Sequence, residues 1–176
     1  AGIDQICQVS ALLGKNHTIV LGYPWHDGVH LYNTAGAFCN GRLVGRYYKQ
    51  CLPNYQVFDE KRYFTEGSEA AVIMVNGISL GLTICEDLWH EGPAAKARAA
   101  GAQILLNLNA SPFHMGKLSH RLKLVAMRAL QNGFPIVYVN LVGGQDELIF
   151  DGGSMVFDKS GGCCASFPEF TESLYL

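Results

Sequence analysis

The sequence predicts an α/β protein with a core of two sheets and helices on the outside. Three observations indicate this class: two Asn-Gly turns between apolar runs, a second half in which helical segments alternate with buried strands, and 49% hydrophobic against 16% charged residues. Asn-Gly between apolar runs is the strongest short-range signal of a β-hairpin. Hairpins therefore lie beside strand–helix–strand units, and such a chain buries its sheets between helices.

The first half contains one helix, one strand and both Asn-Gly hairpins. Residues 3–13 are apolar at roughly helical spacing and end at Gly14, which predicts a helix. Residues 18–23 are predicted to form a buried strand. The hairpins pair residues 31–38 with 42–48 around Asn40-Gly41, and residues 71–75 with 78–85 around Asn76-Gly77.

The second half adds helices between strands. Pro93 opens an alanine-rich helix over residues 93–100, and Gly101 closes it. Residues 103–107 and 135–141 are predicted strands, separated by an amphipathic helix over 118–131 that ends at Gly133. Residues 154–157 and 163–167 flank a final turn at 158–161. The 176 residues suit one domain, with no internal repeat or linker.

Composition excludes several function classes. A net charge of -2 gives no electrostatic reason to expect nucleic acid or an anionic membrane as a partner. No apolar run reaches the ~20 residues of a membrane-spanning helix, and residues 1–8 lack the basic flank of a signal peptide. The six cysteines form no C-x-x-C pair and have no histidines at zinc spacing, so we predict no metal site and a reduced, cytoplasmic protein.

Two glycine-rich segments resemble phosphate loops at first sight. Residues 143–146 read GGQD and residues 151–154 read DGGS. Neither has the spacing of a P-loop or of a dinucleotide-binding loop. We therefore predict that this chain binds no nucleotide.

Cys85 is the first candidate for chemistry. It ends the apolar run of residues 81–89 (GLTICEDLW) and precedes Glu86 and Asp87, so a strand can deliver its thiol to a polar rim. A free thiol has a pKa near ~8.5 and needs a base or a cation to become a good nucleophile. Glu86 and Asp87 would raise that pKa if they faced the thiol. The alternative is a core cysteine that closes a strand.

Lys49 and Glu60 are the other candidates. Lys49 ends a predicted strand, where a cation can stabilise the oxyanion of a tetrahedral intermediate, although a solvated lysine fits the same position. Glu60 can orient Lys49 or pair with Arg62 at the surface. No histidine stands in a local motif that singles it out as the base for a cysteine. A thiol, a lysine and a glutamate together predict an amide-cleaving enzyme.

Four segments together resemble the nitrilase, or carbon–nitrogen hydrolase, superfamily: residues 49–64 (KQCLPNYQVFDEKRYF), 84–90 (ICEDLWH), 106–113 (LNLNASPF) and 139–154 (VNLVGGQDELIFDGGS). They are most similar to the amino-terminal glutaminase domain of bacterial glutamine-dependent NAD⁺ synthetase, over nearly the whole chain. The resemblance implies a nitrilase-like αββα four-layer sandwich that is incomplete at its N-terminus. Residues 1–176 are then part of a glutamine amidotransferase domain.

The resemblance also implies a Glu–Lys–Cys triad. In it Cys85 is the nucleophile, Lys49 stabilises the tetrahedral intermediate, and Glu60 matches a second glutamate found between them in many members. The implied reaction is attack of Cys85 on the side-chain amide of L-glutamine, release of ammonia and hydrolysis of a γ-glutamyl thioester. The residues expected to bind the substrate are Tyr55, Ser111, Lys117, Glu86 and Trp89.

Further parts are expected outside this chain. The triad's glutamate, the general base, lies before the segment equivalent to residues 3–13, and a synthetase domain follows residue 176. That domain would use ATP and Mg²⁺ to amidate deamido-NAD⁺ with the ammonia, while residues 1–176 need no cofactor. We also expect a homo-oligomer. Losing a positioned general base typically lowers the rate by ~10²–10⁴, so the chain alone is predicted to have little activity.

Two alternatives stay open. The first is a free-standing amidase or nitrilase that acts on another small amide or nitrile. The second is a truncated domain that is inactive by itself. The reading frame beyond residue 176 distinguishes the first alternative from a synthetase, because only a synthetase continues into a nucleotide-binding domain.

Overall fold

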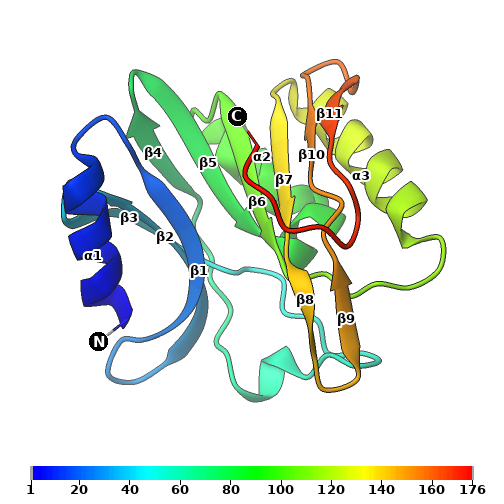
Figure 1. The fold of residues 1–176 in the computed structure, drawn as a ribbon, viewed down its shortest axis with the longest axis horizontal. Helices are drawn as coiled ribbons and strands as arrows, with labels where there is room; N and C mark the ends of the chain where they lie inside the picture. The colour runs from blue at the N-terminus through cyan, green and yellow to red at the C-terminus, as the bar shows by residue number, and fades with distance from the viewer. Residues whose placement is uncertain (1, 176) are drawn as a thin grey trace.

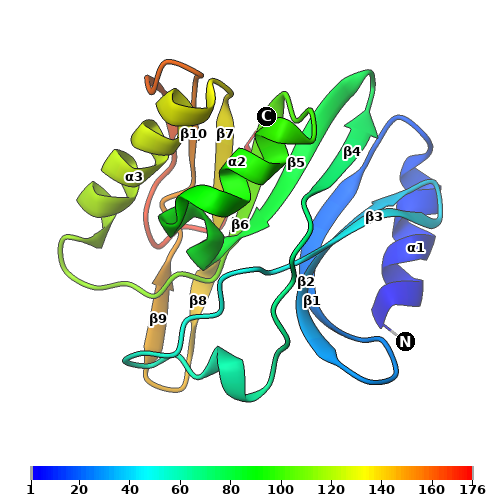
Figure 2. The same ribbon diagram turned by 180° about the vertical axis from the view of Figure 1, so that it is seen from behind.

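A computed structural model describes residues 2–175, which form four layers in the order helix, sheet, sheet, helix (Figure 1). Helix α1 (Gly2–Leu13) covers the outer face of a three-stranded sheet. Helices α2 (Glu91–Ala99) and α3 (Lys117–Asn132) cover the outer face of a six-stranded sheet, as the view from behind shows (Figure 2). The predicted αββα sandwich is thus confirmed. Within residues 2–175 no helix is long and apolar enough to cross a membrane.

The smaller sheet is an antiparallel meander of β1 (Ile19–His26), β2 (Leu31–Cys39) and β3 (Arg42–Tyr48). Asn40 and Gly41 connect β2 to β3 with φ angles of 48° and 79°. Positive φ at both central residues is what a tight type I′ hairpin needs, and Asn and Gly tolerate it best. The Ser10 hydroxyl of α1 accepts a hydrogen bond from the Gly41 amide at 2.9 Å, which ties the helix to this turn.

The larger sheet has the order β11-β10-β7-β6-β5-β4. Its strands are β4 (Ala71–Val75), β5 (Ile78–Ile84), β6 (Ile104–Asn109), β7 (Ile136–Asn140), β10 (Met155–Phe157) and β11 (Cys163–Ser166). The three central strands β5, β6 and β7 are parallel, and α2 and α3 are the crossovers between them. The outer pairs are antiparallel hairpins.

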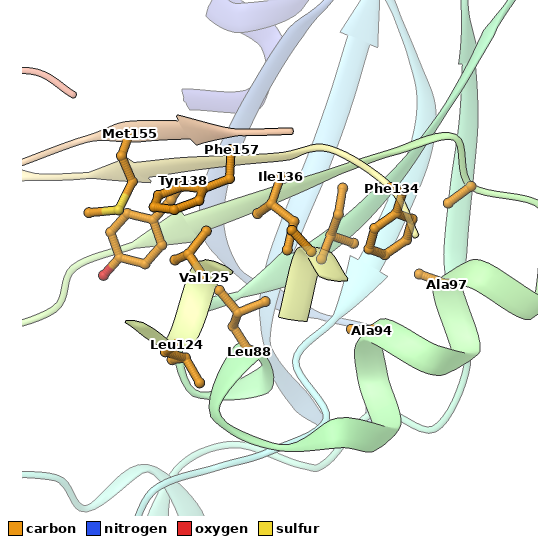
Figure 3. Close-up of a cluster of buried hydrophobic side chains, with 13 residues drawn as sticks. Leu88, Ala94, Ala97, Leu124, Val125, Phe134, Ile136, Tyr138, Met155 and Phe157 are labelled. Carbon is orange, nitrogen blue, oxygen red and sulfur yellow. The ribbon is translucent and has the colours of Figure 1, made fainter. Parts of the chain in front are cut away.

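Two apolar clusters hold the layers together. One lies between the larger sheet and its helices, where Leu88, Val125 and Ile136 are fully buried (Figure 3). The other lies between the two sheets, where Ala35 and Ala37 of β2 pack with larger residues such as Leu82 of β5. Small residues let the sheets approach closely at this side. A Cβ atom at Gly45 would come within 2.2 Å of the Ile73 side chain.

The structure departs from the predicted elements chiefly in three places. The strand predicted over residues 78–85 ends at Ile84, and Cys85 begins a 3₁₀ turn. Strand β1 continues through Pro24 to His26, because an edge strand tolerates a residue without an N–H. A hairpin of β8 (Val142–Gln145) and β9 (Leu148–Asp151) occupies a segment for which no strands were predicted. The cysteines are free thiols, and Cys163 and Cys164 are exposed on the edge strand β11.

Candidate active site

Cys85 lies where β5 ends and a short 3₁₀ turn, η2 (Cys85–Trp89), begins. Its backbone has a φ of 43°, a left-handed conformation that is uncommon outside glycine. Such conformations cost of order 1–3 kcal/mol and cluster at functional sites. The half-buried side chain lines a cavity of about 1410 Å³ that extends between the two sheets.

Lys49 and Glu60 form an ion pair on the same cavity. Lys49 directly follows β3, and its side chain is 1% exposed. Its Nζ lies 2.6 Å from Oε1 of Glu60, which begins the 3₁₀ turn η1 (Glu60–Arg62). Asn33 donates a hydrogen bond to the other oxygen of Glu60 at 3.4 Å. Lys49 is therefore not a solvated lysine, and Arg62 pairs with a different residue, Asp59, at 3.6 Å.

The Cys85 thiol is not activated by its surroundings alone. Burial raises the pKa of Cys85 to about 11, and the nearby Lys49 ammonium acts against this shift. The carboxylates of Glu86, Glu60 and Asp87 raise the pKa further, in that order. At neutral pH the group is thus a thiol, and a nucleophilic attack requires a base to remove its proton.

Tyr55 and Glu86 lie together beside this cavity. The Tyr55 hydroxyl is 2.9 Å from Oε2 and 3.0 Å from Oε1 of Glu86, and Nε2 of His90 is 3.5 Å from Oε1. Burial and the hydrogen bond to Glu86 raise the pKa of Tyr55 to about 12. Tyr55, Glu86 and His90 line a separate hollow of about 440 Å³. They contact one another but do not line the larger cavity.

Lys117 and Trp89 form a second pair. Nζ of Lys117 lies 4.6 Å from the centre of the Trp89 ring, a cation–π contact. Burial and the positive charge of Arg121 lower the pKa of Lys117, while Cys85 and Glu86 act in the opposite direction. Lys117 is therefore a partly desolvated cation at the start of α3, close enough to the Cys85 turn to interact with it.

Ser111 is buried in a polar network beneath the site. Arg121 and Asp151 form a fully buried ion pair with contacts of 2.9 and 2.7 Å. The second arm of Arg121 donates to the carbonyl and hydroxyl oxygens of Ser111 at 2.9 and 3.2 Å. The Asn140 side chain accepts a hydrogen bond from the Ser111 amide and donates one to the Gly152 carbonyl. Ser111 is thus engaged with protein groups and does not line the cavity, whereas Ala110 and Asn140 do.

Two charged residues that the sequence reasoning missed hold the Cys85 turn. Arg128 of α3 donates hydrogen bonds to the carbonyl oxygens of Leu88 and Trp89 at 2.9 and 2.8 Å. Asp87 is fully buried and accepts hydrogen bonds from the segment that carries Lys49. The partners lie 36 to 40 positions apart in the sequence, so no local pattern signals these contacts. Among residues 2–175 no cluster of three His, Cys, Asp or Glu side chains could hold a metal ion.

The chain thus combines an αββα sandwich with a thiol on a strained turn and a buried lysine–glutamate pair between its sheets. A model of the carbon–nitrogen hydrolase family matches residues 6–176 of this chain. The chain therefore belongs to the carbon–nitrogen hydrolase family, as the motifs predicted.

Two curated relatives of this chain share one enzyme name. Glutamine-dependent NAD(+) synthetase of Xanthomonas campestris is 46% identical over 144 residues, which are 81% of this chain and 26% of that protein. The enzyme of the same name from Aquifex aeolicus is 41% identical over 163 residues, 91% of this chain and 29% of that protein. The chain thus spans less than a third of the length of these curated relatives.

Two solved structures, a synthetase and an amidase, superimpose on this chain. Glutamine-dependent NAD+ synthetase from Acinetobacter baumannii, in complex with ADP, superimposes with a TM-score of 0.91 and 38% identity, covering 98% of this chain and 32% of that one. An amidase mutant from Nesterenkonia sp. AN1, with the acetamide moiety of fluoroacetamide covalently added at the active site cysteine, has a TM-score of 0.81 and 25% identity. It covers 94% of this chain and 62% of the amidase. The predicted similarity to the synthetase family is confirmed.

Proposed function

We propose that this chain hydrolyses the side-chain amide of L-glutamine, with Cys85 as the nucleophile. The observation that carries the proposal is the buried ammonium of Lys49, held at 2.6 Å by Glu60 on the cavity that the Cys85 thiol also lines. A fixed, buried cation near a thiol suits the stabilisation of an oxyanion. The similarity to glutamine-dependent synthetases supports glutamine as the source of the amide.

The reaction proceeds in two stages. The Cys85 sulfur attacks the amide carbon once its proton has been removed, and the carbonyl oxygen becomes an oxyanion beside Lys49. The carbon–nitrogen bond then breaks, the nitrogen takes up a proton and ammonia leaves, which forms a γ-glutamyl thioester on Cys85. Water hydrolyses the thioester to glutamate. Glu60 holds Lys49 in place, and the general base is expected outside the described residues.

Two oppositely charged residues near Cys85 suit the two charged ends of a free amino acid. Lys117 is a partly desolvated cation, and we assign it to the α-carboxylate of glutamine. Glu86, which faces Tyr55, is assigned to the α-ammonium group. Trp89 supports Lys117 through its ring, and Ser111 shapes the floor of the site through its bonds to Arg121.

The ammonia has a use in the whole protein. Because the relatives are glutamine-dependent NAD(+) synthetases and are more than three times as long as the matched segment, we assign the ammonia to a synthetase domain of the parent chain. There it would amidate deamido-NAD⁺ in an ATP- and Mg²⁺-dependent reaction. A free-standing amidase is the second candidate, supported by the similarity to the Nesterenkonia amidase.

Substrate discrimination tests the proposal. Hydrolysis of glutamine by the full-length protein is compared with hydrolysis of an amide of similar length without the α-carboxylate, in the wild type, in Cys85→Ala and in Lys117→Met. We expect Cys85→Ala to abolish both activities. Lys117→Met should raise KM for glutamine about tenfold, the loss typical of one charge-assisted contact, and leave KM for the other amide unchanged. Equal losses on both substrates would contradict the glutamine assignment and favour a general amidase.

A further inference from the structure

Asp87 is a buried carboxylate that accepts four hydrogen bonds. Its Oδ1 accepts from the backbone amides of Gln50 and Cys51 at 3.1 and 2.8 Å. Its Oδ2 accepts from the Ile84 amide at 2.9 Å and from the Tyr47 hydroxyl at 2.8 Å. The side chain is fully buried. Burial raises the pKa of Asp87, and its hydrogen bonds and the charge of Lys49 act against this rise.

The four donors come from the two segments that carry the reactive groups. Tyr47 and Gln50 lie on either side of Lys49 in the sequence, and Ile84 immediately precedes Cys85. Side chains two residues apart on a strand point to the same face, so Tyr47 and Lys49 share one face at the end of β3. One carboxylate thus bonds to both segments beside the reactive atoms.

We propose that Asp87 is a positioning residue that holds the Lys49 ammonium and the Cys85 thiol in a fixed arrangement through these four hydrogen bonds. The inference rests on the proposed roles of Cys85 and Lys49. Asp87 is proposed to fix the positions of the two side chains and not to act through its charge, because that charge opposes formation of the Cys85 thiolate. Asp87 raises the pKa of Cys85, so a negative charge here disfavours the thiolate.

The substitution Asp87→Asn separates geometry from charge. It removes the charge and keeps the shape, but its NH₂ group must face two of the four donors. The Tyr47 hydroxyl can rotate to accept a hydrogen bond, whereas the amides of Ile84, Gln50 and Cys51 cannot. If Asp87 acted only as a charge, Asp87→Asn would make Cys85 more reactive and leave the influence of Lys49 intact.

The test is a double-mutant cycle read by alkylation of Cys85. The rate of modification by iodoacetamide at pH 8 is followed on the Cys85 peptide by mass spectrometry in the full-length protein. We expect Lys49→Met to slow the reaction about tenfold in the wild type but less than about twofold in Asp87→Asn, because Lys49 is no longer aligned there. The matched control is Asp146→Asn, which removes a carboxylate from the exposed β8–β9 turn and should keep the tenfold effect.

An equal effect of Lys49→Met in the wild type and in Asp87→Asn would overturn the proposal. Thermal melting shows whether Asp87→Asn is folded. If it is not, Tyr47→Phe takes its place, since it removes one donor and keeps the carboxylate. There the effect of Lys49→Met should fall to about threefold, and an undiminished tenfold effect would overturn the proposal. Alkylation needs no glutamine, so a protein that shows this coupling without hydrolysing glutamine contradicts only the proposed reaction.

Discussion

The buried ammonium of Lys49 and the thiol of Cys85 are stabilised in different ways. A buried cation is costly unless it is paired, and Glu60 supplies the partner at 2.6 Å. A buried thiol is stable while neutral, and its thiolate is not, as the raised pKa of Cys85 shows. Among the charges that act most on Cys85, Lys49 favours the thiolate and three carboxylates oppose it. These surroundings therefore keep the Cys85 sulfur in its neutral thiol form.

This electrostatic balance predicts the pH dependence of Cys85 alkylation. Because the pKa of Cys85 is raised to about 11, the thiolate fraction increases with pH throughout the range below that value. The rate of iodoacetamide modification of the Cys85 peptide should therefore increase about tenfold per pH unit between pH 7 and 10. A rate that levels off near pH 8 would show that the thiol is activated in the resting protein.

Glu60→Gln should change stability and thiol reactivity in opposite directions. Removing the carboxylate leaves Lys49 buried without its counter-charge, so the free energy of unfolding in urea should fall by about 2 kcal/mol, less than for a fully buried pair because Glu60 is partly exposed. The same change removes a charge that raises the pKa of Cys85, so alkylation at pH 8 should become faster.

The exposed pair of Lys61 and Glu66 provides the control for this prediction. Both side chains are more than half exposed, so Glu66→Gln should change the stability by less than about 0.5 kcal/mol. A Glu60→Gln protein that is as stable as the wild type would show that the buried ion pair contributes nothing net.

At the scale of elements, α3 is the scaffold of the Cys85 turn. Its apolar face packs Val125 and Ala129 against the larger sheet. The same side of the helix also places Lys117 over Trp89, Arg121 against Ser111, and Arg128 against the carbonyls at the end of η2. One helix therefore fixes the last residues of η2 and the loop that follows β6.

Arg128→Met should destabilise the protein through this turn. The guanidinium is nearly fully buried, and its loss leaves the carbonyl oxygens of Leu88 and Trp89 without their partner. Two unsatisfied buried acceptors predict a loss of about 2–4 kcal/mol in the free energy of unfolding, measured by urea titration. Lys123→Met, at an exposed position of the same helix, is the matched control and should change the stability by less than about 0.5 kcal/mol. Similar losses for both variants would contradict the scaffold role.

Elements with strong local signals were predictable, and those set by tertiary context were not. The hairpins at Asn40-Gly41 and Asn76-Gly77 follow from turn residues that adopt positive φ in the structure. The β8–β9 hairpin was missed because both strands have only four residues and β8 contains two adjacent glycines, so neither strand has a clear apolar pattern. In the site, motif spacing singled out Cys85, whereas the contacts of Asp87 depend on segments that only the fold brings together.

At the scale of the whole molecule, the two sheets meet closely on one side and diverge on the other. Buried residues such as Ala37 and Leu82 fill the close side. On the other side β1, β7 and β10 line the large cavity. The segment after β11, which crosses in front of β7 in Figure 1, lines it as well. Cys85 lies at the end of β5, where the packed and the open parts of the space between the sheets meet. The layers, and not a surface groove, therefore form the candidate site.

The three carboxylates that act most on the Cys85 thiol each bond to another group of the protein. Glu60 is committed to Lys49, Glu86 to Tyr55 and Asp87 to four donors. Attack on an amide requires a group that removes the thiol proton and later protonates the departing nitrogen.

Residues 1–176 expressed alone should consequently release ammonia from glutamine slowly. We expect a rate ~10²–10⁴ lower than that of the same residues within a protein as long as the curated relatives, since this is the usual loss when a positioned general base is missing. Ammonia release is measured for both proteins at equal concentrations, with thermal melting as the control for folding. Alkylation of Cys85 should persist in the short chain, because Lys49 and Cys85 are both present. Comparable ammonia release by both proteins would place the base within residues 1–176 and would contradict the roles assigned to Glu60 and Glu86.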